Sequence, residues 1–263
     1  MKKFLSMTLA AAMVLSLAAC GGNGSKKEDS TQAGGTDDKT YIIATDTTFA
    51  PFEFTDADNN FVGIDVDIFA AIAEDQGIQY ELQSLGFDAA VASLESGQSD
   101  GVIAGMSITD KRKEQYDFSE AYYDSYVCMA VAENSDIAGY EDLKGKTVAA
   151  KTGTQGADCA ESLKEQYGFK VQYFDDSSLM YQAVTTGNAV ACFEDQPVMA
   201  YGITQGNGLK IAAEEQENFS TPYGFAVLKG SNTELLEKFN TGLANIKENG
   251  KYNEIVAKYT DAE

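Results

Sequence analysis

Short apolar runs alternate along the chain with segments whose apolar residues recur every three or four positions. The apolar runs are typical of buried strands and predict them at residues 41–44, 78–82, 101–104, 145–150, 169–174 and 189–193. The periodic segments predict helices at residues 65–75, 87–95, 157–166, 178–185, 234–248 and 252–259. Strands that alternate with helices in this way indicate an α/β fold with mostly parallel sheets flanked by helices.

The order of these elements repeats between the two halves of the chain. Two further apolar runs, at residues 126–132 and 223–228, read as extended crossovers from one half to the other and back. We therefore predict two similar lobes joined by two hinge strands, with residues 40–126 and 224–263 in lobe 1 and residues 127–223 in lobe 2. A cleft between two such lobes is a natural place for a ligand.

The first forty residues have the pattern of an export signal and a tether. Lys2 and Lys3 precede an apolar run, so residues 1–19 are predicted to be a signal peptide. The segment around Cys20 resembles the lipobox of bacterial lipoproteins, which implies cleavage before Cys20 and lipidation of its thiol. Residues 20–39 are then the lipidated cysteine and a flexible linker. We expect an extracytoplasmic protein that is lipid-anchored to the bacterial membrane, at the cell surface or in the periplasm.

Composition excludes several classes of function. The chain has 263 residues with 41 acids against 19 bases, a net charge of −22 that disfavours binding to nucleic acid. The absence of histidine removes Ser-His-Asp and Cys-His catalysis and histidine-bound metals. Cys20, Cys128, Cys159 and Cys192 form no closely spaced pair, and the last three allow at most one disulfide. We expect a monomer with no metal and no cofactor.

Arg112 is the only arginine of the chain, and it follows Ser107 and Thr109 in a loop that opens a helix-like segment. Thr109 is a good N-cap residue, so Arg112 falls in the first helical turn, where the helix dipole disfavours a cation unless an anion binds there. A guanidinium matches a carboxylate with two parallel hydrogen bonds, which lysine cannot supply. The alternative is a surface arginine paired with Asp110 or Glu114.

Other residues at the ends of predicted strands suit the remaining parts of a zwitterion. Residues 151–155 form a strand-to-helix turn whose amides are available to an anion. Asp195 ends a buried strand and suits an ammonium group, while Glu194 should face the opposite way and be structural or exposed. Phe49 and Phe87 lie at the predicted rim of the cleft, with a place in the core as the alternative for each. Together these residues predict a trap for a molecule that carries a carboxylate and an amine.

Several motifs resemble the polar amino-acid substrate-binding proteins of bacterial ABC importers. They lie in family order over the chain from about residue 40, at residues 45–54, 62–67, 107–112, 117–119 and 153–155. The resemblance implies a hinged, two-lobed Venus-flytrap fold of the type II periplasmic binding proteins. It also implies capture of a polar L-amino acid and its delivery to a membrane permease, with no enzymatic activity.

The same resemblance assigns roles to the two ends of an amino acid's backbone. Arg112 would hold the α-carboxylate, helped by Ser107 and by the amides near Thr154 and Gln155. The α-amine would bind Asp195 and the carbonyl of Gly105.

The ligand's side chain would lie between Phe49 and Phe87, with Asp46 at its polar end. Lys151 would face Asp46 across the cleft, as in glutamine-binding members, and would repel a cationic side chain. We therefore favour glutamine over arginine, lysine or histidine, which stay open as ligands. Three rival functions also stay open: a cyclohexadienyl dehydratase-like enzyme with Glu53 or Glu194 as its acid, a sensory domain and a lipoprotein adhesin.

Overall fold

The computed structural model describes residues 39–220 and 222–260. The predicted signal peptide, Cys20 and most of the predicted linker lie outside these residues. None of the helices within the described residues has both the length and the hydrophobicity to cross a bilayer.

The first five-stranded sheet has its strands in the order β4-β1-β5-β12-β6. Its strands are β1 (Thr40–Thr45), β4 (Gln79–Ser84), β5 (Gly101–Val102), β6 (Tyr116–Phe118) and β12 (Ala226–Leu228). The helices of this lobe are α1 (Ile64–Gln76), α2 (Phe87–Glu95), α3 (Asp110–Lys113), α7 (Thr233–Glu248) and α8 (Lys251–Thr260). A small hairpin, β2 (Phe54–Thr55) and β3 (Phe61–Val62), precedes α1.

The second five-stranded sheet has the order β11-β7-β10-β8-β9. Its strands are β7 (Tyr126–Ala132), β8 (Thr147–Lys151), β9 (Lys170–Phe174), β10 (Ala191–Asp195) and β11 (Leu209–Ser220). Its helices are α4 (Gln155–Tyr167), α5 (Ser177–Thr185), α6 (Gln196–Thr204) and the 3-10 turn η1 (Tyr140–Leu143).

In each sheet four of the five strands run the same way and one runs against them. The reversed strands are β12 in the first sheet and β7 in the second, which lie in the two runs predicted as crossovers. When the first sheet is read from β4 and the second from β9, the reversed strand is the fourth in both sheets. These features confirm the predicted α/β fold of two similar lobes with mostly parallel strands.

Side-chain alternation along the strands explains why helices cover both faces of each sheet. On β1, Ile43 packs with residues of α1 and α7, whereas its neighbour Ala44 packs with α2. On β10, Phe193 packs with α4 residues and Cys192 with α5 residues. Strands buried on both faces read as continuous apolar runs, which is why the sequence shows them so clearly. Each fully buried aliphatic side chain contributes about 1.5–3 kcal/mol of stability.

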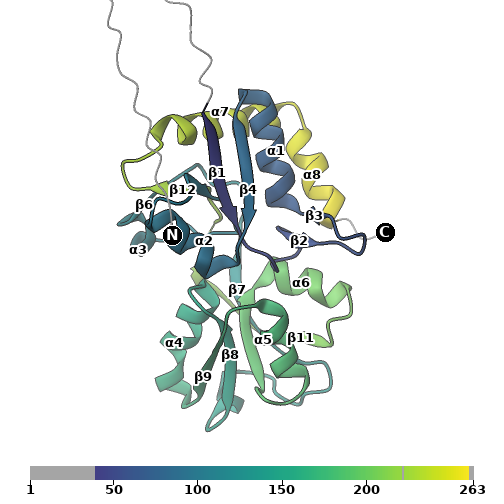
Figure 1. Cartoon of the computed structure of the whole chain (residues 1–263). Helices are drawn as coiled ribbons and strands as arrows, with labels where there is room; N and C mark the ends of the chain where they lie inside the picture. Colours follow the sequence, from purple (N-terminus) through teal and green to yellow (C-terminus); the bar gives the residue numbers. More distant parts are fainter. Residues whose placement is uncertain (1–38, 221, 261–263) are drawn as a thin grey trace, which may run out of the picture. The chain divides into compact units, whose positions relative to one another are not determined.

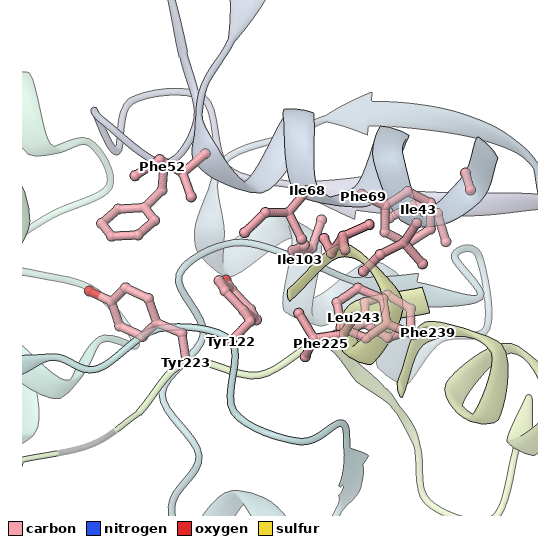
Figure 2. Packing of buried hydrophobic residues seen from close by; sticks show 14 of the residues in the cluster. Ile43, Phe52, Ile68, Phe69, Ile103, Tyr122, Tyr223, Phe225, Phe239 and Leu243 are labelled. Atoms are coloured by element: carbon pink, nitrogen blue, oxygen red, sulfur yellow. The ribbon is translucent and has the colours of Figure 1, made fainter. Parts of the chain in front are cut away.

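The largest cluster of buried residues joins the first sheet to α1, α7 and α8 (Figures 1 and 2). Phe225 and Phe239 stack within it, with ring centroids 4.7 Å apart. Phe52, Tyr122 and Tyr223 belong to the same cluster; Phe52 and Tyr223 lie at the left of Figure 2, and Tyr122 lies between Tyr223 and Phe225. The cluster therefore extends from the helices of lobe 1 to the segment that returns from lobe 2.

Six elements were not predicted from the sequence: β2, β3, β6, η1, α6 and β11. The edge strand β11 has register shifts between Ile211 and Ala213 and between Glu215 and Ser220. These irregularities interrupt the alternation by which a strand is recognised. Helix α6 begins directly after β10, so the apolar run of the strand hides the helical period that follows it.

Candidate functional site

One cavity between the lobes is lined by residues from both of them. Its empty space is about 250 Å³ when the part open to solvent is included. Its lining residues are Asp46, Phe49, Phe87, Ala104, Gly105, Ser107, Arg112, Lys151, Thr154, Gln155 and Asp195. The structure thus brings together all ten residues that the sequence predicted to bind a ligand.

Strand ends explain this convergence. Asp46 directly follows β1, and Gly105 lies in the loop after β5. Lys151 and Asp195 are the last residues of β8 and β10. In sheets of this kind the loops beyond the carboxyl ends of the strands build the ligand site.

The guanidinium of Arg112 is held by the backbone of both lobes. Thr109 caps α3, as predicted, by accepting a hydrogen bond from the backbone N–H of Arg112 at 3.2 Å. Nη1 of Arg112 donates to the carbonyl of Ser107 at 2.8 Å, and Nη2 donates to the carbonyl of Gly153, in lobe 2, at 3.0 Å. The guanidinium carbon lies 5.4 Å from the centre of the Phe87 ring.

This cation has no carboxylate partner among the residues that the structure describes, since no acid there lies within 4.0 Å of the Arg112 guanidinium. Asp110, one of the two surface partners considered from the sequence, forms its ion pair with Lys113 instead. Arg112 has five N–H groups and gives two of them to carbonyls, so donors remain for an anion in the cavity.

Asp195 provides the opposite charge from lobe 2 and is buried. The hydroxyl of Tyr223 donates a 2.5 Å hydrogen bond to its Oδ2, and Ser125 Oγ lies 3.0 Å from that hydroxyl. Burial, and after it the charge of Glu194, raises the pKa of Asp195 to about 7. A cation placed beside this carboxyl would favour its charged form.

The end of the cavity next to Phe49 carries an ion pair that spans the lobes. Nζ of Lys151 donates to Oδ2 of Asp46, and the two side chains are only 1% and 2% exposed. The ammonium also lies 5.3 Å from the centre of the Phe49 ring. Lobe 1 and lobe 2 therefore neutralise each other's charge at this end.

The N-terminus of α4 opens onto the same cavity. Thr154 caps the helix by accepting from the backbone N–H of Ala157 at 3.2 Å, and Gln155 is its first residue. Gly156 lets the helix approach β10, because a Cβ there would lie 2.5 Å from the carbonyl oxygen of Phe193. A helix N-terminus attracts an anion through its dipole and its free amides.

The family model of the bacterial extracellular solute-binding proteins, family 3, matches residues 41–262. The chain belongs to this family of solute-binding proteins. The match covers both lobes and every residue of the cavity.

Known solute-binding proteins resemble it over most of their length. The arginine-binding extracellular protein ArtP of Bacillus subtilis is 31% identical, with 100% of both chains covered. The second substrate-binding domain of GlnP from Lactococcus lactis, solved in an open conformation, is 43% identical, with 85% of this chain and 96% of that chain covered and a TM-score of 0.58. An ancestral arginine-binding protein bound to glutamine is 38% identical, with coverage of 85% and 98% and a TM-score of 0.77.

Glu194 lies next to the cavity of this solute-binding protein without lining it. Its side chain faces α5, where Ser177 Oγ donates at 3.2 Å and the Tyr181 hydroxyl at 2.9 Å. It also accepts from the backbone N–H of Asp195 at 2.9 Å. The alternation argument placed Glu194 correctly on the face opposite Asp195, and of its two expected roles the exposed one is wrong.

Sequence reasoning missed the contribution of Tyr223 to the site. The residue begins an apolar run that was interpreted only as a crossover, and its hydroxyl is the one that holds Asp195. It also missed Ala104, whose small side chain lines the cavity. Neither residue has a local signal, because each depends on a partner far away in the chain.

Proposed function

We propose that this solute-binding protein captures a free polar L-amino acid outside the cytoplasm and delivers it to the membrane permease of an ABC importer. The observation that carries the proposal is a guanidinium that has no acidic partner among the described residues and shares one buried cavity with a carboxyl from the other lobe. A free α-amino acid has a carboxylate and an ammonium on one carbon, so it offers both partners at once.

In this proposal the backbone of the ligand binds at the Arg112 end of the cavity. The α-carboxylate accepts from Arg112, from Ser107 and from the amides at the start of α4. The α-ammonium donates to Asp195 and to the carbonyl of Gly105. Charge-assisted hydrogen bonds of this kind are roughly twice as strong as hydrogen bonds between neutral groups.

The ion pair between Lys151 and Asp46 favours glutamine as the ligand. A guanidinium or ammonium at the end of a ligand side chain would lie near the buried cation of Lys151. Glutamine carries no charge there, and its amide both donates and accepts, so it suits a site that offers an ammonium and a carboxylate. An ancestral arginine-binding protein has been solved with glutamine and with arginine bound, so this likeness is compatible with either ligand and the ion pair carries the choice.

A basic amino acid is the second candidate ligand. It is favoured by the names of the relatives, since ArtP of Bacillus subtilis is named for arginine. Asp46 would be the natural partner of a cationic side chain, but only if Lys151 moved away from it.

The mechanism is binding coupled to hinge closure, a motion typical of periplasmic binding proteins. The hydrogen bonds of Arg112 with Gly153 and of Thr48 with Asp176 join the lobes in this structure. A ligand that contacts both lobes binds the closed form better and so shifts the population towards it. The higher TM-score with the ligand-bound ancestral protein than with the open domain, despite lower identity, supports a closed arrangement here.

Neither candidate acid of the enzymatic hypothesis is placed to react with a ligand. Glu53 is fully buried and does not line the cavity, and Glu194 is held by α5. A general acid must come within hydrogen-bond distance of the group that it protonates. The relatives are named as binding proteins, and we propose binding without catalysis for this chain as well.

The membrane tether completes the proposal. Cleavage before Cys20, its lipidation and a linker up to residue 39 would hold the two lobes near the permease. The monomeric state, and the lobe boundaries near residues 126 and 224, are part of the same proposal.

The experiment is a thermal-shift screen of the purified protein against the twenty amino acids, followed by calorimetry of those that stabilise it. Only a ligand that binds the native state raises the melting temperature. We expect the largest shift with L-glutamine and little or none with L-arginine or D-glutamine. A largest shift with arginine would favour the second candidate, and the absence of any shift would contradict amino-acid binding.

A further inference from the structure

Two carboxyl groups are sealed behind the loop that carries Gly105. Glu53, in the segment after Phe49, and Asp65, in the first turn of α1, are both 0% exposed. Oδ2 of Asp65 accepts from the backbone N–H of Gly105 and from the hydroxyl of Tyr122, each at 2.7 Å. Neither oxygen of Glu53, nor Oδ1 of Asp65, receives a hydrogen bond from any donor in the described part of the chain.

Buried carboxylate oxygens without donors are costly, and two neighbouring negative charges in the interior are more costly still. One shared proton eases both difficulties, because a protonated carboxyl donates to its neighbour and the pair then carries one negative charge instead of two. Burial first, and then the charges of Asp65 and Asp46, raise the pKa of Glu53 well above its usual range. Burial also raises the pKa of Asp65, to about 6, while its bonds from Gly105 and Tyr122 favour its charged form.

This pair touches two walls of the cavity. Gly105 has a φ of 52°, and a Cβ there would lie 2.4 Å from the Phe49 side chain. Glycine is therefore the residue that fits at this position. The bond from the Gly105 N–H to Asp65 fixes the orientation of that peptide. Glu53 pairs with Phe49 through both backbone bonds, at 2.8 and 3.3 Å, and so sets the aromatic wall.

We propose that Glu53 and Asp65 share one proton, and that Asp65, held in place by that proton, is a positioning residue for the Gly105 loop of the ligand site. The proposal rests on the proposed function in one respect, the role of Gly105 in binding the α-amine. It predicts that ligand binding weakens when the shared proton is lost at alkaline pH.

The charged and titratable groups around the pair set the direction of this effect. Asp46 and Asp65 face Glu53 and favour its protonated form, whereas Lys151, from lobe 2, opposes them. Tyr122 faces Asp65, and Tyr252 of α8 donates to the carbonyl of Tyr122 at 2.5 Å. Loss of the proton would give the Glu53–Asp65 pair a second negative charge, close to the charge of Asp46, so it should loosen both loops.

The test uses variants that replace the shared proton with an amide N–H. In Glu53→Gln the new amide can donate to Oδ1 of Asp65, and in Asp65→Asn it can donate to Glu53, so each keeps a bond without a titrating proton. Glu74→Gln, which changes an exposed acid on α1, is the matched control. Affinity for L-glutamine is measured by calorimetry between about pH 5 and pH 9.

We expect Glu53→Gln to bind within about threefold of wild type near pH 7 and to lose part of the alkaline weakening that wild type and Glu74→Gln share. One titrating proton changes affinity by at most about tenfold per pH unit. Asp65→Ala should bind more than tenfold less tightly, because it leaves the Gly105 N–H buried without an acceptor. Asp65→Asn should retain most of the affinity and serves if the alanine variant fails to fold.

A second measurement needs no ligand. Because the folded protein holds the Glu53 proton more tightly than the unfolded chain does, stability falls as the pH rises from the unfolded pKa of about 4.3 towards the raised folded value. The free energy of unfolding of Glu53→Gln, measured with urea, should therefore depend less steeply on pH than that of wild type. The difference in slope should correspond to at most one bound proton. The infrared carbonyl band of a protonated carboxyl should also disappear in this variant.

Parallel pH profiles for wild type and Glu53→Gln, in both binding and unfolding, would overturn the proposal. So would an infrared band that the substitution leaves unchanged. If no amino acid binds at any pH, the proposed function fails alone, since the unfolding and infrared measurements still decide whether the proton is shared.

Discussion

The two ends of the cavity treat their charges differently. At one end Arg112 and Asp195 come from different lobes, line the same space and make no ion pair with each other. At the other end Lys151 and Asp46 also come from different lobes and are paired with each other. In the proposed function the first end keeps its charges for a ligand, whereas the second end has already neutralised them. On that proposal, the first end recognises any amino acid and the second end selects its side chain.

The largest expected effect comes from removing the unpaired cation. Arg112→Ala should weaken binding of the preferred amino acid by about 2–5 kcal/mol, because the buried α-carboxylate would lose its partner. Calorimetry measures this loss, with Lys113→Ala, an exposed cation one residue away, as the control. If both variants bind as wild type does, the carboxylate end is assigned wrongly.

Removing the ion pair between Lys151 and Asp46 should change the selectivity among amino acids more than the affinity for them. Lys151→Met removes the cation and leaves Asp46 free to pair with a basic ligand. We expect the preference for glutamine over arginine to fall by about 1.5–3 kcal/mol, the usual contribution of a hydrogen bond to a charged group. Competition binding measures this ratio. Lys146→Met, exposed just before the same strand, is the control, and an unchanged ratio in Lys151→Met would show that the pair does not select the side chain.

A smaller effect on binding affinity is expected when the pH is lowered. The pKa of Asp195, raised to about 7, should fall when an ammonium binds beside it, so binding near neutral pH releases a proton. Affinity should then weaken as the pH falls below about 7, by up to about tenfold per unit, and this contribution of Asp195 should level off above it. Calorimetry in buffers of different ionisation enthalpy detects the released proton. Equal heats in all buffers would place the amine away from Asp195.

The smallest effect is expected outside the cavity. Thr48 Oγ1 donates to Asp176 in the other lobe at 3.2 Å, without lining the cavity. Thr48→Val should weaken binding by about 0.5–1.5 kcal/mol, the net value of one hydrogen bond. The control is Thr47→Val, measured by the same calorimetry. A loss as large as that of Arg112→Ala would mean that contacts between the lobes, rather than the ligand's charges, dominate closure.

Local signals predicted most of the fold. Helix α2 was predicted with its observed bounds, and Gly77 and Gly168 end α1 and α4 in the left-handed conformation that glycine adopts readily. Strands buried on both faces gave clear apolar runs. β11 and α6 could not be found this way. β11 is an edge strand with an irregular register, and α6 follows directly on the apolar run of β10, which masks its helical period.

The candidate site was predictable where its residues follow strands, because topology gathers the ends of parallel strands. The contacts that hold those residues were not. Tyr223 meets Asp195, and Asp65 meets Gly105, over separations of 28 and 40 residues. Pairings of this kind follow from tertiary packing and have no period or spacing in the sequence.

The position of β12 affects the order in which the protein can be completed during synthesis. This strand lies between β5 and β6 in the first sheet, yet it follows the whole second sheet along the chain. A ribosome therefore makes all five strands of the second lobe before it makes the strand that joins β5 to β6. Until then the first lobe has two open strand edges, which are sites for aggregation. The edges of β5 and β6 therefore stay unpaired until β12, close to the end of the chain, has been made.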